Sequence, residues 1–405
     1  MKQADLGLAP AVLRVGWLML FVAWLAQTSV YFGGMATGPI APFLQEDLRI
    51  TRAEVGFLAS AFSAGTMLTL LPAGWLADRF GVRLLLALGP GFSGLFFIAA
   101  GRASSYSMVV VAVLVAGLGA GVATPAATKA VMDWFAARTR GTAMGIKQTG
   151  TSLGGAVAAA TLPAVALTAG WREAMALVGL VNVGVAVLCY LVYRDVVVPK
   201  VRAVAKPRGS LRAVLADRDV RLTCLTGLCF SAAQLAVATY LVLYLKEALG
   251  MEVAAAGGLL ALAQMSGVAG RIVLGIGSDR LLGGRRRETI IFTGVGSLAA
   301  AAVMALAGPS LPALALTVVM LVFGFTGMAY TGVFMTLISE LSGKEATGIG
   351  SAVGLAACNL GTLVGPPLFG LLIDRTSSYP LGWGAVALTA GLGTLLIWPV
   401  RERRG

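Results

Sequence analysis

The chain has 405 residues, of which 58% are hydrophobic and only 12% are charged, whereas a soluble domain has about 25% charged residues. This balance excludes an ordinary soluble domain and is typical of an integral membrane protein. The formal net charge of +13 is better explained by membrane topology than by nucleic acid, so we expect no nucleic-acid partner. Histidine is absent and the four cysteines lack metal-ligand spacing, so we expect no metal and no cofactor.

Twelve apolar runs separated by short polar breaks follow one another along the chain. Each is long enough to cross a bilayer as a helix. The runs cover residues 13–43, 52–77, 83–101, 106–135, 141–169, 172–193, 219–246, 254–278, 288–307, 311–339, 346–373 and 380–400. Thr51 and Glu54 have the spacing of a helix capping box, which supports a helix start there. The sequence therefore predicts an all-α membrane protein with twelve transmembrane helices.

The loops between these runs predict the orientation. An even number of spans places both termini on one side of the membrane, and most Lys and Arg residues of the loops fall on that side. By the positive-inside rule, both termini are then cytoplasmic and the protein is a multi-pass component of the cell inner (plasma) membrane.

A polar, basic stretch divides the spans six and six. We therefore expect an N-terminal six-helix bundle at 1–195, a cytoplasmic linker at 196–218 and a C-terminal six-helix bundle at 219–405. The stretch contains two prolines and many cations, which suits a solvated linker better than a further span.

The two halves also repeat each other weakly. When the second half is aligned with the first, Gly74 matches Gly275, Asp78 matches Asp279, and Thr124 matches Thr331. Internal symmetry of this kind is typical of transporters whose site lies between two related bundles near the membrane midplane. We therefore expect two pseudo-symmetric bundles.

Three motifs carry a family resemblance. G74-W-L-A-D-R-F-G-V-R and G275-I-G-S-D-R-L-L-G-G-R-R resemble the loop between spans two and three of major facilitator superfamily transporters and its second-half copy, and R140-G-T-A-M-G-I-K-Q-T-G resembles the start of their fifth span. The resemblance covers the whole chain and implies the major facilitator fold with transport by alternating access. It also implies cytoplasmic latches that hold one conformation closed, formed by Asp78, Arg79, Arg83, Asp133, Asp279, Arg280 and Glu340.

Arg271 is an always-charged side chain inside an apolar segment. It lies eight residues before Asp279, hence about 12 Å inside the helix end at 1.5 Å per residue. Charges at this depth mark functional sites by default, and a guanidinium without a carboxylate nearby indicates a site for an anion. The pattern G-R-x-x-x-G-x-x-S-D-R resembles the eighth span of oxalate/formate exchangers and monocarboxylate transporters, which implies that Arg271 contacts the substrate. The alternative is a structural arginine that donates to backbone carbonyls of the protein.

Other polar side chains at membrane depth complete the expected site. Lys147 lies at a similar depth in the other half and either contacts the substrate or packs between helices. Gln148 falls on the position of a cavity glutamine in the sugar transporters that its motif resembles. Lys129 either pairs with Asp133 on its own helix or contacts the substrate directly, and in both cases it adds positive potential on the approach path. The remaining expected substrate contacts are Gln27, Tyr31, Gln234, Tyr330 and Asn359.

These features predict a secondary active or facilitative transporter and not an enzyme, because no nucleophile–base pair is visible. The expected cargo is a small organic anion, with a monocarboxylate favoured, carried alone, with protons or against a counter-anion. A porter for nitrate, nitrite or cyanate is the alternative, and a drug/proton antiporter is less favoured because the acidic residues are confined to loops and span ends. The expected partners are the substrate and the lipid bilayer, and we expect a monomer.

Overall fold

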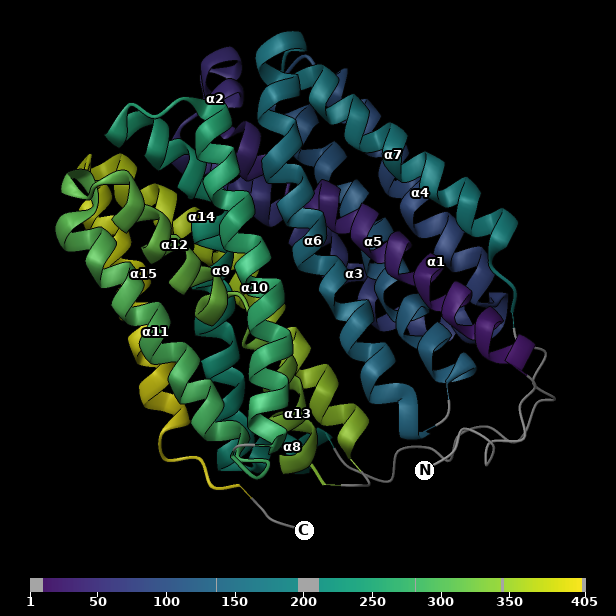
Figure 1. Cartoon of the computed structure of the whole chain (residues 1–405). Coiled ribbons are helices and arrows are strands. Elements are labelled where there is room, and N and C mark those ends of the chain that lie inside the picture. The colour runs from purple at the N-terminus through teal and green to yellow at the C-terminus, as the bar shows by residue number, and fades with distance from the viewer. Residues whose placement is uncertain (1–9, 136, 196–210, 281, 344–345, 403–405) are drawn as a thin grey trace.

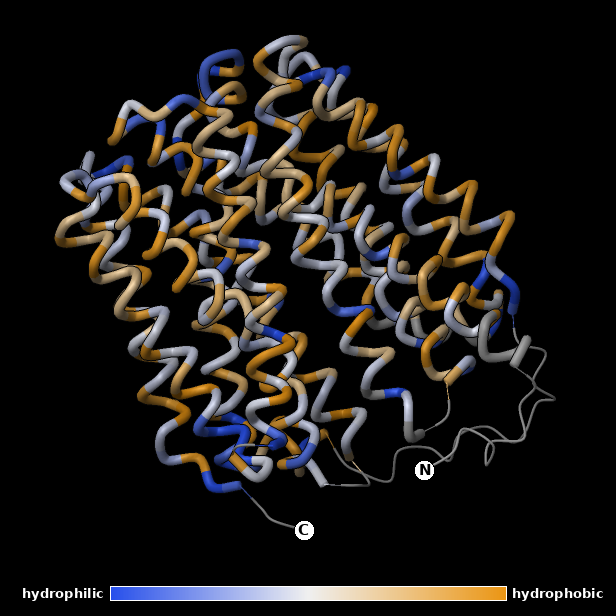
Figure 2. Tube along the Cα trace, viewed as in Figure 1, coloured by the Kyte–Doolittle hydropathy of each residue, from blue (hydrophilic) through white to orange (hydrophobic). Residues whose placement is uncertain are grey.

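The computed structural model describes residues 10–135, 137–195, 211–280, 282–343 and 346–402. All regular secondary structure in these ranges is helical, and twelve helical segments among them are long and apolar enough to cross a membrane. Large apolar side chains such as Leu191, Leu306 and Leu388 are exposed on the outer faces of these helices, and hydrophobic residues run along most of their length (Figure 2). The prediction of an all-α, twelve-span membrane protein is confirmed.

The first six spans form the N-terminal bundle, coloured purple to teal in Figure 1. The first span consists of two helices separated by a break at Met35 and Ala36, although the sequence presents it as one apolar run. The helices of this bundle are α1 (Pro10–Gly34), α2 (Thr37–Leu48), α3 (Arg52–Phe80), α4 (Val82–Gly101), α5 (Tyr106–Trp134), α6 (Ala137–Ala169) and α7 (Trp171–Val192).

The last six spans form the C-terminal bundle, which follows the short helix α8 (Leu211–Ala216). Residues 196–210 of the predicted linker lie outside the described residues. The tenth span is broken between α12 and α13, at Met328–Tyr330. The helices of this bundle are α9 (Arg218–Leu249), α10 (Val253–Arg280), α11 (Arg286–Ala307) with the 3-10 turn Gly308–Ser310, α12 (Ala313–Gly327), α13 (Thr331–Leu341), α14 (Thr347–Thr376) and α15 (Tyr379–Ile397).

The two ends of the molecule are defined by the chain termini. Helix α1 begins and helix α15 ends at one end, here called the terminal end, whereas α2 ends and α3 begins at the other, here called the opposite end (Figure 1). The bundles pack mainly through α3 against α14 and through α6 against α10, with α2 against α9. The interface thus pairs the second span with the eleventh and the fifth with the eighth.

The capping box predicted at the start of the second span is present. The backbone N–H of Glu54 donates to Thr51 Oγ1 at 3.2 Å, and the backbone N–H of Thr51 donates to the Glu54 carboxylate at 2.7 Å. These bonds satisfy two backbone donors that a helix start would otherwise leave unpaired. They fix the first residue of α3 at the opposite end of the interface.

Glycines bring the bundles close together at the opposite end. A Cβ on Gly56 of α3 would overlap the backbone of Pro366 in α14, and a Cβ on Gly370 of α14 would overlap the backbone of Arg52 in α3. Only a residue without a side chain allows the two backbones to approach so closely. The bundles are therefore tightly packed at this end.

Candidate functional site

Arg271 of α10 joins the two bundles. Its Nη1 atom donates to the backbone carbonyl of Gln148 in α6 at 2.8 Å and also to the Thr151 hydroxyl, while its Nε atom donates to the carbonyl of Met328 at 3.1 Å. The Met328 carbonyl is available because it lies in the break between α12 and α13, where the regular helical ladder is interrupted. The broken tenth span and the intact fifth span together hold this guanidinium.

Lys147 approaches the same place from the N-terminal bundle. Its side chain is buried, and its ammonium donates to the Thr128 hydroxyl of α5 at 3.0 Å and to Gln148 Oε1 at 3.1 Å. The amide of the fully buried Gln27 in α1 donates to the same Gln148 oxygen at 3.2 Å. Gln148 therefore contacts Lys147, Arg271 and Gln27.

Two predicted tyrosines also lie near Arg271. Tyr31 of α1 and Tyr330 both lie close enough to Arg271 for their hydroxyls to interact electrostatically with its guanidinium, and Tyr31 also lies beside Thr124 of α5. Tyr330 is buried, with its ring 5.2 Å edge-on from that of Phe230. The structure thus brings together Gln27, Tyr31, Lys147, Gln148, Arg271 and Tyr330, which we call the central cluster.

The central cluster carries positive charge without a resident counter-charge. Among the residues that the structure describes, neither Lys147 nor Arg271 makes an ion pair with a carboxylate. The buried oxygens of the Gln27 and Thr124 side chains have no hydrogen-bond partner in the same ranges. Because removing a charge from water costs several kcal/mol unless it is compensated, this arrangement suits an anion that brings its own charge and further polar groups.

Three predicted contacts lie apart from this cluster or take part in other contacts. Gln234 lines a small void inside the C-terminal bundle, beside Phe230 and Ser297. The Asn359 amide donates to the Leu355 carbonyl of its own helix at 3.0 Å. Lys129 is half-buried on α5 and is engaged in an interaction, so it is not a free charge.

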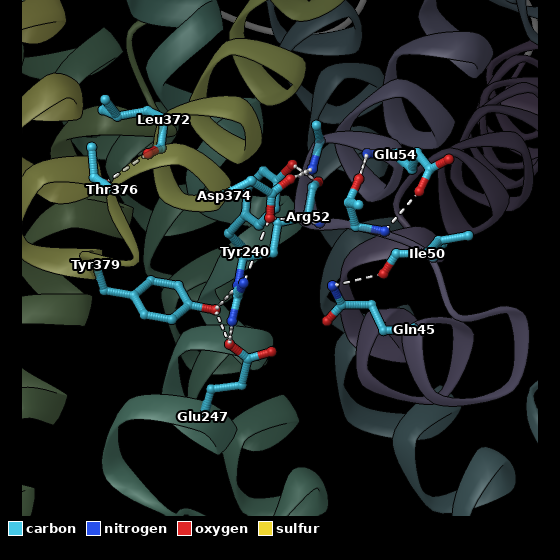
Figure 3. A network of polar contacts seen from close by, with 12 residues as sticks. Gln45, Ile50, Arg52, Glu54, Tyr240, Glu247, Leu372, Asp374, Thr376 and Tyr379 are labelled. Atoms are coloured by element: carbon cyan, nitrogen blue, oxygen red, sulfur yellow. Dashed lines mark hydrogen bonds and ion pairs between the residues drawn. The ribbon is translucent and has the colours of Figure 1, made fainter.

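A second polar network joins the bundles at the opposite end (Figure 3). The Arg52 guanidinium of α3 lies 2.6 Å from the Glu247 carboxylate of α9 and 3.5 Å from the Asp374 carboxylate of α14. The Tyr379 hydroxyl of α15 donates to Glu247 at 2.7 Å, and its ring lies under the guanidinium. One arginine of the N-terminal bundle is thus enclosed by an acidic and aromatic set from the C-terminal bundle, here called the Arg52 network.

The Arg52 network also completes a helix end. The Asp374 carboxylate accepts the backbone N–H groups of Arg52 at 3.2 Å and of Ala53 at 2.8 Å, which are unpaired donors of the first turn of α3. The Tyr240 hydroxyl donates to the Arg52 carbonyl at 2.5 Å. Negative charge at a helix N-terminus is stabilising, so the C-terminal bundle supplies part of the cap of a helix in the other bundle.

The charge cluster of the second predicted latch is centred on a different arginine. Arg286 of α11 pairs with Asp279 of α10, and its Nε atom lies 3.6 Å from the Glu340 carboxylate of α13. Arg280 is exposed, and no contact is described for it among the residues that the structure covers. These described contacts all lie within the C-terminal bundle.

The first predicted latch has fewer described contacts. Arg83 donates to the Tyr190 carbonyl at 2.7 Å and stacks on the Tyr190 ring, and Arg79 lies over the Phe80 ring. The side chain of Asp78 lies outside the described residues. Asp133 is engaged in an interaction and is not a free charge.

Two acidic residues that the sequence reasoning missed cap helices at the terminal end. Asp195 accepts the backbone N–H groups of Val82 and Arg83 at 2.9 and 3.0 Å, next to Gly81, whose φ of 83° allows this close turn. Glu402 likewise accepts the backbone N–H of Arg287. The repeat could have revealed these two residues. An Arg-Asp pair, Arg194-Asp195, follows the last span of the first half, and an Arg-Glu pair, Arg401-Glu402, follows the last span of the second half.

The residues of the Arg52 network were harder to recognise from the sequence. Arg52, Glu247 and Asp374 each stand at the end of a span, where charged residues are expected as ordinary loop residues. The polar partners Thr128 and Thr151 were also missed, because threonine is common in transmembrane helices and carries no charge. Only the packing of the bundles reveals what these residues contact.

Comparisons with known proteins bear on the family and the fold of the chain. A sequence profile described as Major Facilitator Superfamily matches residues 23–366. The “Probable sulfoacetate transporter SauU” of Cupriavidus necator is 29% identical over 416 residues, covering 96% of this chain and 94% of that protein. The “Probable L-galactonate transporter” of Escherichia coli is 26% identical over 382 residues, covering 89% of this chain and 83% of that protein.

A similar fold is found among solved structures. The crystal structure of a bacterial homologue of the human lysosomal transporter Spinster, in an inward-facing and unoccupied conformation, has a TM-score of 0.76 at 16% identity, covering 96% of this chain and 95% of that chain. At this identity the likeness supports the arrangement of the helices alone.

Proposed function

The chain belongs to the Major Facilitator Superfamily, and from this premise we propose that it carries a small organic anion across the bacterial inner membrane by alternating access. The proposal rests on one observation. The guanidinium of Arg271 lies between the two bundles and has no carboxylate partner among the described residues. A planar guanidinium binds a carboxylate through paired hydrogen bonds, and its Nη2 atom donates to no group in the described part of the chain.

The two relatives support an organic cargo. One is named for sulfoacetate and the other for L-galactonate, and both compounds are small anions with a carboxylate. We propose that Arg271 holds the carboxylate of the cargo, and that the amides and hydroxyls of Gln27, Gln148 and Tyr31 contact its remainder. A monocarboxylate is the simplest cargo that meets this requirement.

Alternating access is supported by the uneven interface. The hydrogen bonds and ion pairs that join described residues of different bundles involve Arg52 and Ala53 of α3 at the opposite end, Ser60 with Thr362 further in, and Arg271 at the central cluster. Because cations concentrate in the loops of the terminal end, we propose that this end is cytoplasmic and that the described conformation is closed toward the outside. The Arg52 network would open, and the predicted latches would close, in the alternate conformation.

The test is transport by the purified protein in liposomes. The panel contains lactate, an aromatic monocarboxylate, succinate and nitrate, each measured in counterflow and with an imposed pH gradient. Arg271→Gln and Arg271→Lys are expected to reduce uptake of the transported organic anion at least about 100-fold and about 10-fold, because charge-assisted hydrogen bonds of about 1.5–3 kcal/mol are lost or misaligned. Arg102→Gln, at an exposed loop position, is the matched control and should transport like the wild type.

Two results would contradict the proposal. Wild-type rates for Arg271→Gln with every organic anion would show that the guanidinium does not bind the cargo. Uptake of nitrate alone would favour the inorganic-anion alternative, for which a planar guanidinium is also a suitable partner. Counterflow without a response to the pH gradient would assign exchange or facilitated transport in place of proton coupling.

A further inference from the structure

The central cluster contains one cation from each bundle, and both cations donate hydrogen bonds to the same residue. Lys147 of the N-terminal bundle donates to the side chain of Gln148, and Arg271 of the C-terminal bundle donates to its backbone carbonyl. The two charged groups are therefore separated by no more than the span of one glutamine and two hydrogen bonds. A molecule of a few carbon atoms is long enough to contact both.

Both cations keep donors that neutral partners do not use. The ammonium of Lys147 has three N–H bonds, and the described partners are two neutral oxygens, from Thr128 and Gln148. The guanidinium of Arg271 has five, and its described partners are the carbonyls of Gln148 and Met328 and the Thr151 hydroxyl. Neutral oxygens satisfy hydrogen bonds but supply no negative charge to balance the guanidinium or a protonated lysine.

The same chain compensates other cations with its own carboxylates. Arg52 pairs with Glu247 and Asp374, and Arg172 pairs with Asp47. Each of these arginines is in part exposed to solvent, whereas Lys147 is buried. Because a low-dielectric setting makes an uncompensated charge more costly, the absence of a carboxylate partner among the described residues matters most at the central cluster.

We infer that the cargo is a short dianion, such as a dicarboxylate or a carboxylate with a second acidic group, with one acidic group on Arg271 and the other on Lys147. This inference rests on the proposed function and narrows its small organic anion to a dianion in place of a monocarboxylate, since a monoanion would compensate only one of the two cations. A dianion placed in this way also links the bundles through its own two ends. Binding of the cargo then adds a shared anionic ligand to the contacts through which Arg271 already joins the bundles.

The experiment compares two ligands that differ by one charge. Succinate and succinamate have the same carbon skeleton, and malonate and malonamate form a shorter pair. Each is titrated against the purified protein at pH 7.5, and the rise in thermal unfolding temperature gives the affinity, because a ligand that binds only the folded state stabilises it by mass action. This readout does not depend on transport direction or on the coupling ion.

The expected result is a preference for charge. At least one dianion should bind at least about 10-fold more tightly than its monoamide, the effect of one charge-assisted hydrogen bond. Lys147→Gln should remove this preference while retaining the affinity for the monoamide, and Lys147→Arg should keep it. Thr128→Val, which removes a partner of the lysine but not its charge, should also keep the preference and serves if Lys147→Gln does not fold.

Each other result has a distinct meaning. Equal affinity for a dianion and its monoamide in the wild type overturns the inference and leaves organic-anion transport standing. A preference that survives in Lys147→Gln overturns the assignment of the second acidic group to Lys147. If none of these ligands binds and the liposome panel shows no organic-anion uptake, the proposed function itself fails.

Discussion

Two arginines reach from one bundle into the other, and they end on different kinds of partner. Arg52 at the opposite end meets two carboxylates and a tyrosine hydroxyl, whereas Arg271 in the central cluster meets two carbonyls and a threonine hydroxyl. The difference separates two tasks. We propose that Arg52, whose counter-charges belong to the protein, holds the bundles together, and that Arg271, which has no such counter-charge among the described residues, binds the cargo.

The largest expected effect comes from giving Arg271 an internal counter-charge. Thr151→Asp places a carboxylate where the hydroxyl now accepts from the guanidinium. The new ion pair would compete with the cargo, so transport should fall about 100-fold, the effect of a charge-assisted hydrogen bond of up to about 3 kcal/mol. Uptake in liposomes measures the loss. Thr151→Asn, with the same shape and no charge, should retain most of the activity; equal losses in both variants would contradict the comparison.

A smaller effect is expected from removing the counter-charge of Arg52. Asp374→Asn weakens both the ion pair and the cap of α3. Because the pair is partly exposed, we expect a cost of about 1 kcal/mol, which shifts the balance toward opening at this end about five-fold. Distances between spin labels placed on α2 and α9 at the opposite end would report the shift. An unchanged distance distribution would show that the network does not hold this end closed.

The smallest effect is expected from breaking an arginine–aspartate ion pair that lies within one bundle. Arg172 of α7 pairs with Asp47 of α2 at 2.6 Å, and both side chains are exposed. Arg172→Gln should destabilise the fold by less than about 1 kcal/mol and should leave the spin-label distances of the preceding experiment unchanged. Thermal unfolding measures the first effect. A shift in the distances as large as that of Asp374→Asn would mean that any charge at this end controls opening.

The span count and the fold class could be predicted from the sequence, because they follow from hydropathy and residue spacing alone. The same spacing placed Arg271 and Lys147 within apolar spans, and they lie within the helices α10 and α6. Arg271 and Lys147 could be recognised because a charged residue inside an apolar span needs either a polar partner in the protein or a ligand. Their meeting at Gln148 could not be predicted. It depends on how α6 and α10 are rotated about their axes, which packing decides.

The same limit explains the differences at other positions. Gln234 lies at the expected depth, but its helix directs it toward a void among Phe230, Ser297 and Phe323. The position of a residue along a helix follows from its place in the sequence. The direction in which its side chain points depends on how the helix packs against its neighbours. The break before α13 was hidden for a related reason, since the glycines around it also occur within unbroken transmembrane helices.

The cap that Asp374 supplies to α3 has a consequence for local order. In the alternating-access cycle that we propose, separation of the bundles at the opposite end would deprive the amide groups of Arg52 and Ala53 of their acceptor and expose them to water, so that the first turn of α3 would be free to fray. Hydrogen–deuterium exchange at these two amides would therefore act as a natural reporter of which way the protein faces, without any label. The length of this helix would then depend on the step of the proposed transport cycle and not on the sequence alone.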